Sequence, residues 1–262
     1  MADADALLRE GDVAGARGAL TDIVRSRPSD PQARMFLFQL LAIAGEWDKA
    51  RKALQALTQL EAEAQMLAMA YNQAIDGEEL RARVFAGAAE MPLLANPEGW
   101  AAGVARGLTL FARGDEAGAV AARDAAFDVA PDMPCRLNGE PAEWIADGDS
   151  RFGPTLEVIV AGRYGLLPFD AVEKITSEGP RDLRDLVWYP VEIAMRSGQS
   201  LAAFLPTRYP GSERSTNGAE QLARVTRWDD AEWGQRGLGQ RVWVRDDGED
   251  CGVLSLRTLE FA

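Results

Sequence analysis

The chain has 262 residues, 47% of them hydrophobic and 26% charged, which is typical of a soluble globular protein long enough to form two cores. Its formal net charge of −13 repels phosphate backbones, so nucleic acid is excluded as an expected partner. The sequence contains no histidine, which removes the commonest general base, the usual nitrogen ligand of zinc and every serine–histidine relay.

Targeting and redox features point to the cytoplasm. No apolar run approaches the roughly 20 residues that a membrane span needs, and residues 1–5 are acidic where a signal peptide would be basic. Cys135 and Cys251 lack the paired spacing of a metal site. They could form a disulfide, although two free thiols in a reducing compartment fit the composition better. We expect a cytoplasmic protein with no cofactor and no contact with a membrane.

One spacing occurs twice near the N-terminus, with a period of 34 residues. A glycine, an alanine and two aliphatic residues return in the same order, first as Gly11, Ala16, Leu20 and Ile23 and then as Gly45, Ala50, Leu54 and Leu57. This period is that of the tetratricopeptide unit, two antiparallel helices joined by a tight turn. Each glycine falls at the turn, where a residue without a Cβ is favoured. Stacked units leave a concave surface suited to another polypeptide, so this half is predicted to bind protein.

The repeat continues less regularly. Val13 returns as Trp47, whose ring we expect to fill the seam between the two helices of its pair. Residues 63–92 have helical periodicity but few repeat positions, which indicates a degenerate or capping helix pair. A third copy is indicated by small residues and a proline at Gly107, Gly114, Ala119, Ala126 and Pro131. The alternative is a plain helical bundle with accidental spacing.

The chain changes character between Pro131 and Pro134, where two prolines end the preceding helix. We predict an α+β protein, with tetratricopeptide-like helical hairpins over 1–132 and a mostly antiparallel, β-rich domain with short helices over 133–262. Alternating apolar runs predict its strands at 156–160, 163–169, 191–195, 201–205, 242–244 and 253–259. Polar turns at 197–200 and 246–250 predict two hairpins, and the short helices are expected at 141–146 and within 180–186.

Candidate chemistry is sparse. Asp147 and Asp149 stand two residues apart and could hold a hard cation for a metal-dependent hydrolase, although a solvated turn that caps the preceding segment fits better. Ser212 has neither a nucleophile-elbow motif nor a histidine partner. The segment 237–241 is a fragment of a dinucleotide fingerprint, and a turn explains it better. The sequence therefore predicts no enzyme activity.

Four motifs in the second half resemble the ImpE family, also called SciE or TagJ. They are Asp147-Gly148-Asp149-Ser150-Arg151-Phe152-Gly153-Pro154, Leu183-Arg184-Asp185-Leu186-Val187-Trp188, Tyr209-Pro210-Gly211-Ser212 and Gly237-Leu238-Gly239-Gln240-Arg241. Their order, the helical repeats and the chain length also agree with that family. The resemblance implies a non-enzymatic, cytoplasmic accessory protein of the bacterial type VI secretion system. It further implies that the partner is the N-terminal helix of the small contractile-sheath subunit, with a link to the AAA+ ATPase that recycles the sheath.

Large amphipathic and charged residues near these motifs are the candidate protein-binding residues, because such residues are enriched at interface hot spots. They are Trp144, Arg151, Phe152, Arg184, Asp185, Trp188 and Tyr189. For the aromatic residues the alternative is a place in the core. For Arg151 and the pair Arg184–Asp185 it is a structural ion pair, and Asp149 facing Arg151 is another candidate pair. A general tetratricopeptide scaffold or co-chaperone with an unrelated client is a second hypothesis for the whole chain.

Overall fold

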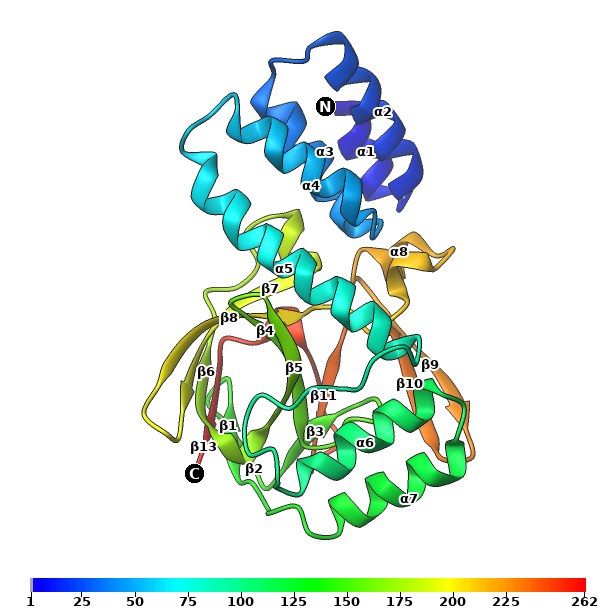
Figure 1. Ribbon diagram of the computed structural model, residues 1–262, viewed down its shortest axis with the longest axis vertical. Coiled ribbons are helices and arrows are strands. Elements are labelled where there is room, and N and C mark those ends of the chain that lie inside the picture. Colours follow the sequence, from blue (N-terminus) through cyan, green and yellow to red (C-terminus); the bar gives the residue numbers. More distant parts are fainter. Residues whose placement is uncertain (1) are drawn as a thin grey trace.

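Helices form the first half of the chain and strands most of the second half in the computed structural model, which describes residues 2–262 (Figure 1). This arrangement confirms the predicted α+β class. The helices of the first half are α1 (Ala2–Arg9), α2 (Val13–Ser26), α3 (Pro31–Ile43), α4 (Trp47–Thr58), α5 (Ala64–Phe85), α6 (Ala101–Ala112) and α7 (Glu116–Phe127).

Three helical hairpins, α1–α2, α3–α4 and α6–α7, have the turns that the repeat predicts. Gly11, Gly45 and Gly114 occupy these turns with φ angles of 85°, 66° and 80°, in the left-handed region that favours glycine. Aspartates cap the second helix of two of these hairpins, as Asp12 accepts a hydrogen bond from the Gly15 N–H and Asp115 accepts one from the Gly118 N–H, whereas α4 begins after Glu46 without a side-chain cap. Backbone conformation and capping therefore fix the hairpins locally.

The expected helix pair over 63–92 is wrong, because α5 is one continuous helix of 22 residues. No proline interrupts it, and its first left-handed glycine, Gly87, lies beyond its end. Gly77 lies within the helix for a packing reason: a Cβ there would approach the Ile159 side chain to 2.9 Å. The predicted place of Trp47 is also wrong. Its half-buried ring lies against Trp188 of the second half, with ring centroids 5.7 Å apart, and not in the seam of its own hairpin.

The largest sheet within residues 2–262 has eight strands in the order β2-β1-β13-β6-β7-β8-β4-β5, all neighbours antiparallel. Its strands are β1 (Cys135–Leu137), β2 (Glu140–Ala142), β4 (Thr155–Val160), β5 (Arg163–Pro168), β6 (Val172–Thr176), β7 (Trp188–Met195), β8 (Ser200–Pro206) and β13 (Thr258–Phe261). Two smaller sheets contain β3 (Ile145–Asp147), β11 (Val242–Arg245) and β12 (Asp250–Gly252), and β9 (Thr226–Ala231) and β10 (Gly234–Gly239). Short helical turns are η1 (Phe169–Ala171), η2 (Leu183–Leu186), η3 (Ser212–Arg214), α8 (Gly218–Gln221) and η4 (Val253–Ser255).

Local pairing follows the sequence where two strands adjoin one turn. The hairpins β4–β5 and β7–β8 form as predicted, and η2 lies within the expected 180–186. Two expectations for short segments are wrong. Residues 141–146 form parts of β2 and β3, with Pro141 tolerated because β2 is an edge strand. Residues 237–239 belong to strand β10, which ends at the left-handed Gly239.

The second hairpin has a different partner strand from the predicted one. β11 pairs with the short β12, and the chain then turns through η4 before β13 joins the large sheet between β1 and β6. That placement buries Leu259 and Phe261, which a solvent-facing hairpin would leave exposed.

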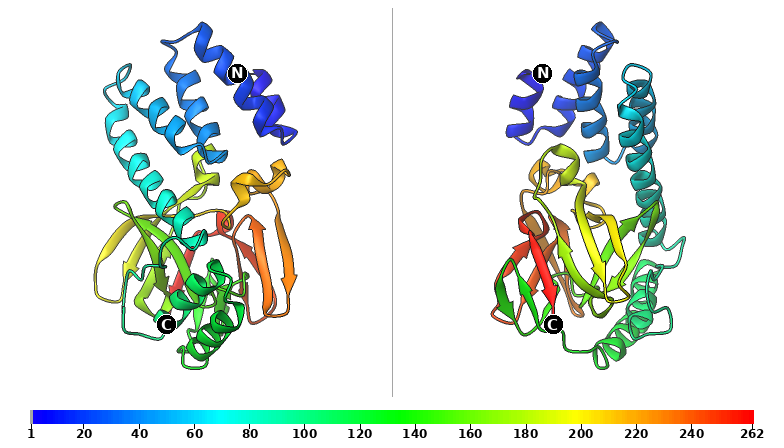
Figure 2. Two further views of the ribbon diagram at one scale, coloured as in Figure 1. Left: turned by 45° about the vertical axis from the view of Figure 1, so that its right-hand side comes forward. Right: turned by 90° about the vertical axis from the view of Figure 1, so that its left-hand side faces the viewer.

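The two halves share a hydrophobic core. One cluster of buried side chains joins Leu20 and Ile43 of the hairpins to Trp188 and Tyr209 of the second half. The predicted division into 1–132 and 133–262 stays a prediction, since the core runs across it. In two views, α1–α4 stack at one end and α5 runs from them along the strands (Figure 2).

Arginines from the second half bind the C-terminal ends of the first helices of two hairpins. Arg224 donates to the carbonyls of Leu8 and Arg9 at the end of α1, at 2.8 and 3.0 Å. Arg208 donates to the carbonyl of Ile43, the last residue of α3, at 2.8 Å. Helix C-termini carry unpaired carbonyls and partial negative charge, so both cations are placed favourably.

Candidate functional site

The aromatic candidates divide sharply by burial. Phe152, Trp188 and Tyr189 are fully buried, so they occupy the core, which was the alternative for the aromatic residues, and they do not reach the surface of the chain. Trp188 packs against Tyr71 and Trp47 and thereby joins the second half to the hairpins. Trp144, on the turn between β2 and β3, is 44% exposed and stays available to a partner.

The charged candidates form structural pairs. Arg151 is buried and donates to both carboxylate oxygens of Asp149, at 2.8 and 2.6 Å. Asp185 is buried and caps η2 by accepting from the N–H of Asp182 at 3.1 Å. Arg184 pairs with the carboxylate of Asp182 and not with Asp185. These three residues therefore take part in ion pairs or caps within the chain, as the structural alternative expected, and a partner contact by the half-buried Arg184 stays a prediction.

A buried network of charges lies between α5 and the sheets. Arg241 is 1% exposed, and its guanidinium forms ion pairs with the carboxylates of Asp147 and Glu157. Glu157, on β4, also accepts from Arg81 of α5 at 2.7 and 3.1 Å. Tyr209 donates its hydroxyl to Asp147 at 2.8 Å. The network therefore links a helix of the first half to strands of the second through fully desolvated charge-assisted bonds.

The charges in this network shift the pKa of each carboxyl group differently. Burial alone would raise the pKa of Glu157, but the charges of Arg81 and Arg241 outweigh it and lower that pKa to about 2. Burial raises the pKa of Asp147 to about 6, because Arg241 offsets only part of the burial and Asp149 adds a like charge. Both carboxylates are ionised at neutral pH.

This arrangement corrects both earlier interpretations of Asp147 and Asp149. The segment is not a solvated turn, since both side chains are buried. Their carboxylates are bonded to Arg241 and Arg151, and Asp149 also accepts from the Gly237 N–H at 3.0 Å. Among residues 2–262, no group of three or more possible metal-ligating side chains is gathered in one place. The two aspartates therefore act as anchors for arginines.

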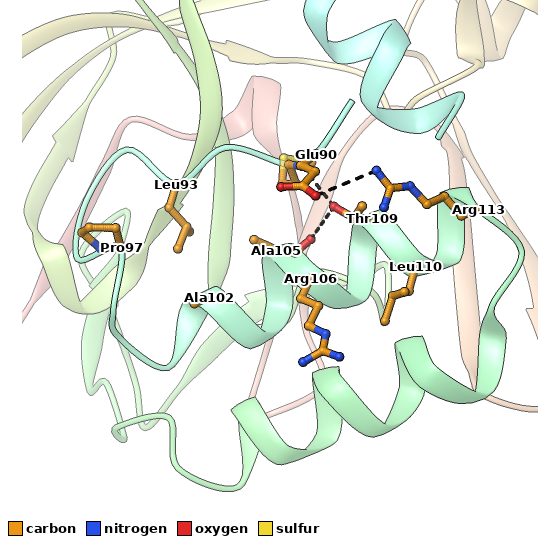
Figure 3. A pocket seen from close by; sticks show the side chains of 10 residues that line it. Glu90, Leu93, Pro97, Ala102, Ala105, Arg106, Thr109, Leu110 and Arg113 are labelled. Carbon is orange, nitrogen blue, oxygen red and sulfur yellow. Dashed lines mark hydrogen bonds and ion pairs between the residues drawn. The ribbon is translucent and has the colours of Figure 1, made fainter. Parts of the chain in front are cut away.

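Several hollows mark the described surface, and two of them involve the helices α6 and α5. The first, of about 520 Å³, lies between the segment 90–97 and α6 (Figure 3). Glu90 and Arg113 point toward one another there, 4.0 Å apart, and Arg106 extends away from that pair. The Thr109 hydroxyl at its base accepts from the Met91 N–H and donates to the Ala105 carbonyl, both at 3.0 Å. The second hollow, of about 390 Å³, lies where α5 crosses the large sheet.

Comparison with known proteins fits this geometry. The sequence profile of the ImpE protein family matches residues 139–260, and a tetratricopeptide-repeat profile matches residues 7–73. The type VI secretion system accessory component TagJ of Pseudomonas aeruginosa is 43% identical over 260 residues, which cover 98% of this chain and 90% of that protein. The chain belongs to the ImpE family. The crystal structure of protein VPA1032 from Vibrio parahaemolyticus has the same fold, with a TM-score of 0.88 at 21% identity, covering 99% of this chain and 97% of that one.

Three of the four ImpE motifs that the sequence singled out, the first, third and fourth, meet around the charged network. Asp147 and Asp149 come from the first motif, Tyr209 and Ser212 from the third, and the Gly239 N–H of the fourth donates to Ser212 Oγ at 2.8 Å. Sequence reasoning missed their common purpose. A signal was available in two charged residues beside buried strand positions, Glu157 within Leu156–Val158 and Arg241 before Val242–Trp243. In this ImpE chain the motifs build the framework of the β-rich half.

Within residues 2–262, no helix is both long enough and apolar enough to cross a lipid bilayer.

Proposed function

We propose that this chain is a non-enzymatic accessory component of a type VI secretion system and acts by binding other proteins. The observation that carries the proposal is the 43% identity to TagJ, which extends along 98% of the chain. A match of this length includes both the helical hairpins and the β-rich half, so the shared role need not rest on one domain. The tetratricopeptide match over residues 7–73 supports a protein ligand, because stacked helical hairpins serve as docking surfaces.

The proposed partner is the N-terminal helix of the small contractile-sheath subunit, and the proposed consequence is a link to the AAA+ ATPase that recycles the sheath. A cytoplasmic location follows from this role. Support for a binding role over catalysis comes from the charged groups of the interior. Asp147, Asp149 and Glu157 are each paired with an arginine, so these carboxylates serve cohesion and not hydrolysis.

Co-purification tests this proposal. The tagged full-length chain is mixed at low salt with the purified small sheath subunit, either intact or lacking its N-terminal helix. We expect the intact subunit to be retained and the shortened one to be lost. Failure to retain the intact subunit would contradict the proposal, and so would equal retention of both forms. Adding the ATPase in a second step asks whether the bound pair recruits it.

A further inference from the structure

The first half of α5 carries an unusual exposed surface. Met66 is 78% exposed and Met69 is 60% exposed, although large apolar side chains are otherwise mostly covered in this chain. Ala70 and Gln73 follow on the same face, at the spacing of i, i+3, i+4 and i+7 from Met66. We call these four residues the methionine stripe. Over seven residues it extends about 10 Å along the helix axis, or two turns.

The methionine stripe runs into an uncharged groove. Where α5 crosses the sheet, a hollow of about 390 Å³ begins beside Ala70 and Gln73. Its other walls come from the β4–β5 turn and from β7 and β8, and all of its lining residues are uncharged: Ala70, Gln73, Ala74, Ile159, Ala161, Gly162, Pro190, Val191, Ala202, Ala203 and Phe204. In a chain with 26% charged residues and a net charge of −13, a continuous uncharged surface of this extent marks a contact site.

Acidic side chains surround this surface. Glu61 and Glu63 are exposed just before α5, at the far end of the methionine stripe. Glu192 is exposed on β7, opposite the groove residue Ala202 in the strand register. One cation, Arg163, is exposed next to the β4–β5 turn. The rim is therefore mainly negative, and it complements a partner with basic side chains on either side of an apolar stripe.

The walls also determine the secondary structure of the partner. One wall is the side of α5, whose backbone groups are bonded within the helix, and the other wall is formed by residues of β4, β7 and β8. An extended peptide lying along α5 would find no backbone partners on that wall, whereas a helix satisfies its own N–H and C=O groups. Exposed methionines suit such a contact, since their flexible side chains adapt to the shape of an apolar helix face.

We propose that the methionine stripe and the uncharged groove together bind one amphipathic helix of a partner protein, with apolar anchors at i, i+3 or i+4, and i+7 and with lysine or arginine on its flanks. The inference rests on the proposed function for the identity of the partner as a sheath subunit, but the surface itself is defined by its chemistry. A second copy of this chain is the competing occupant.

The test uses the full-length chain with the double substitution Met66→Glu/Met69→Glu. The matched control is Val129→Glu, which adds a charge at another exposed apolar residue, 69% exposed just after α7. Because all three positions are exposed, the unfolding curves of both variants should match that of the unsubstituted chain. Binding is measured by fluorescence anisotropy with two labelled probes. One is the N-terminal helix of the small sheath subunit, and the other is a synthetic leucine–lysine amphipathic helix compared with its scrambled sequence.

We expect the double variant to bind both helical probes at least tenfold more weakly, with the control within twofold of the unsubstituted chain. Unchanged binding by the double variant would overturn the proposed surface and leave the sheath role intact. If the unsubstituted chain binds the synthetic helix but not the sheath probe, and the double variant loses the synthetic helix, the sheath role is overturned and the surface is left intact. Equal binding of the scrambled peptide, or self-association that the double variant abolishes, would overturn the inference itself.

Discussion

Replacing Glu157 by glutamine should destabilise the protein strongly, because this carboxylate receives two arginines in the dry interior. Glu157 is fully buried and bonded to Arg81 at 2.7 and 3.1 Å and to Arg241. Removing one partner from a buried ion pair costs about 3–5 kcal/mol, since the opposite charge is left without compensation. The same two arginines lower the pKa of Glu157 to about 2 from an ordinary 4.5, a shift that corresponds to about 3 kcal/mol.

Urea unfolding followed by circular dichroism at pH 7 measures this loss of stability. In thermal unfolding, the melting temperature should fall by roughly 6–12 °C for about 3 kcal/mol in a chain of this size. The control is Glu79→Gln, which removes a half-exposed partner of Arg51 and should cost under about 1 kcal/mol. A cost below about 1 kcal/mol for Glu157→Gln would refute the view that the network holds α5 to the sheet.

Acid titration tests whether stability changes with pH in the direction that the lowered pKa of Glu157 requires. The folded-state pKa of Glu157 lies below its unfolded value, so the stabilisation is fully present above about pH 4.5 and is lost as the pH falls toward 2. The unsubstituted chain should therefore lose more stability than Glu157→Gln across that window. Parallel acid profiles for the two proteins would show that Glu157 is not held ionised by its neighbours.

Three further outcomes follow from the contacts. Because the pKa of Asp147 is raised to about 6, the unsubstituted chain should lose about 3 kcal/mol of stability as the pH rises from about 4 through 6. Asp147→Asn should not show this loss. Urea midpoints of the unsubstituted chain that stay identical across that window would contradict this prediction. Trp47→Ala should cost about 2 kcal/mol in thermal unfolding, below the range for a fully buried tryptophan, because its ring is half-buried against Trp188. Gly218→Ala should cost about 1–3 kcal/mol, because its Cβ would overlap the Gly11 carbonyl; a neutral result in the same assay would mean that the two halves do not touch there.

The repeat architecture could be predicted because its causes are local. A left-handed turn favours glycine, as at Gly11, Gly45 and Gly114, and aspartates cap the helices that follow the first and the third of these turns. The same holds for the β7–β8 hairpin, whose strands adjoin one turn. Helical periodicity over 63–92 did not show that residues 64–85 form one helix, α5. Gly77 lies inside this helix because a Cβ there would approach the Ile159 side chain to 2.9 Å.

The candidate site was the part least accessible to sequence reasoning. Burial decided the outcome for Trp188 and Tyr189, and burial depends on which surfaces meet in three dimensions. Arg184 was assigned to its chain neighbour Asp185, but the turn of η2 directs it to Asp182. The methionine stripe lies in a segment with regular helical periodicity, and only the placement of α5 over the edge of the sheet shows that Met66 and Met69 are uncovered.

The sequence by itself determined the helical hairpins, their turns, most of the strands and the family, since each is encoded by short spacings or by ordered motifs. Tertiary structure alone decided the partners of the charged side chains. Arg81 meets Glu157 across 76 residues and Arg241 meets Asp147 across 94, and spacing along the chain contains no trace of such distant pairs. Their energy exists only once water is excluded around them, so the property that joins the two halves belongs to the folded protein.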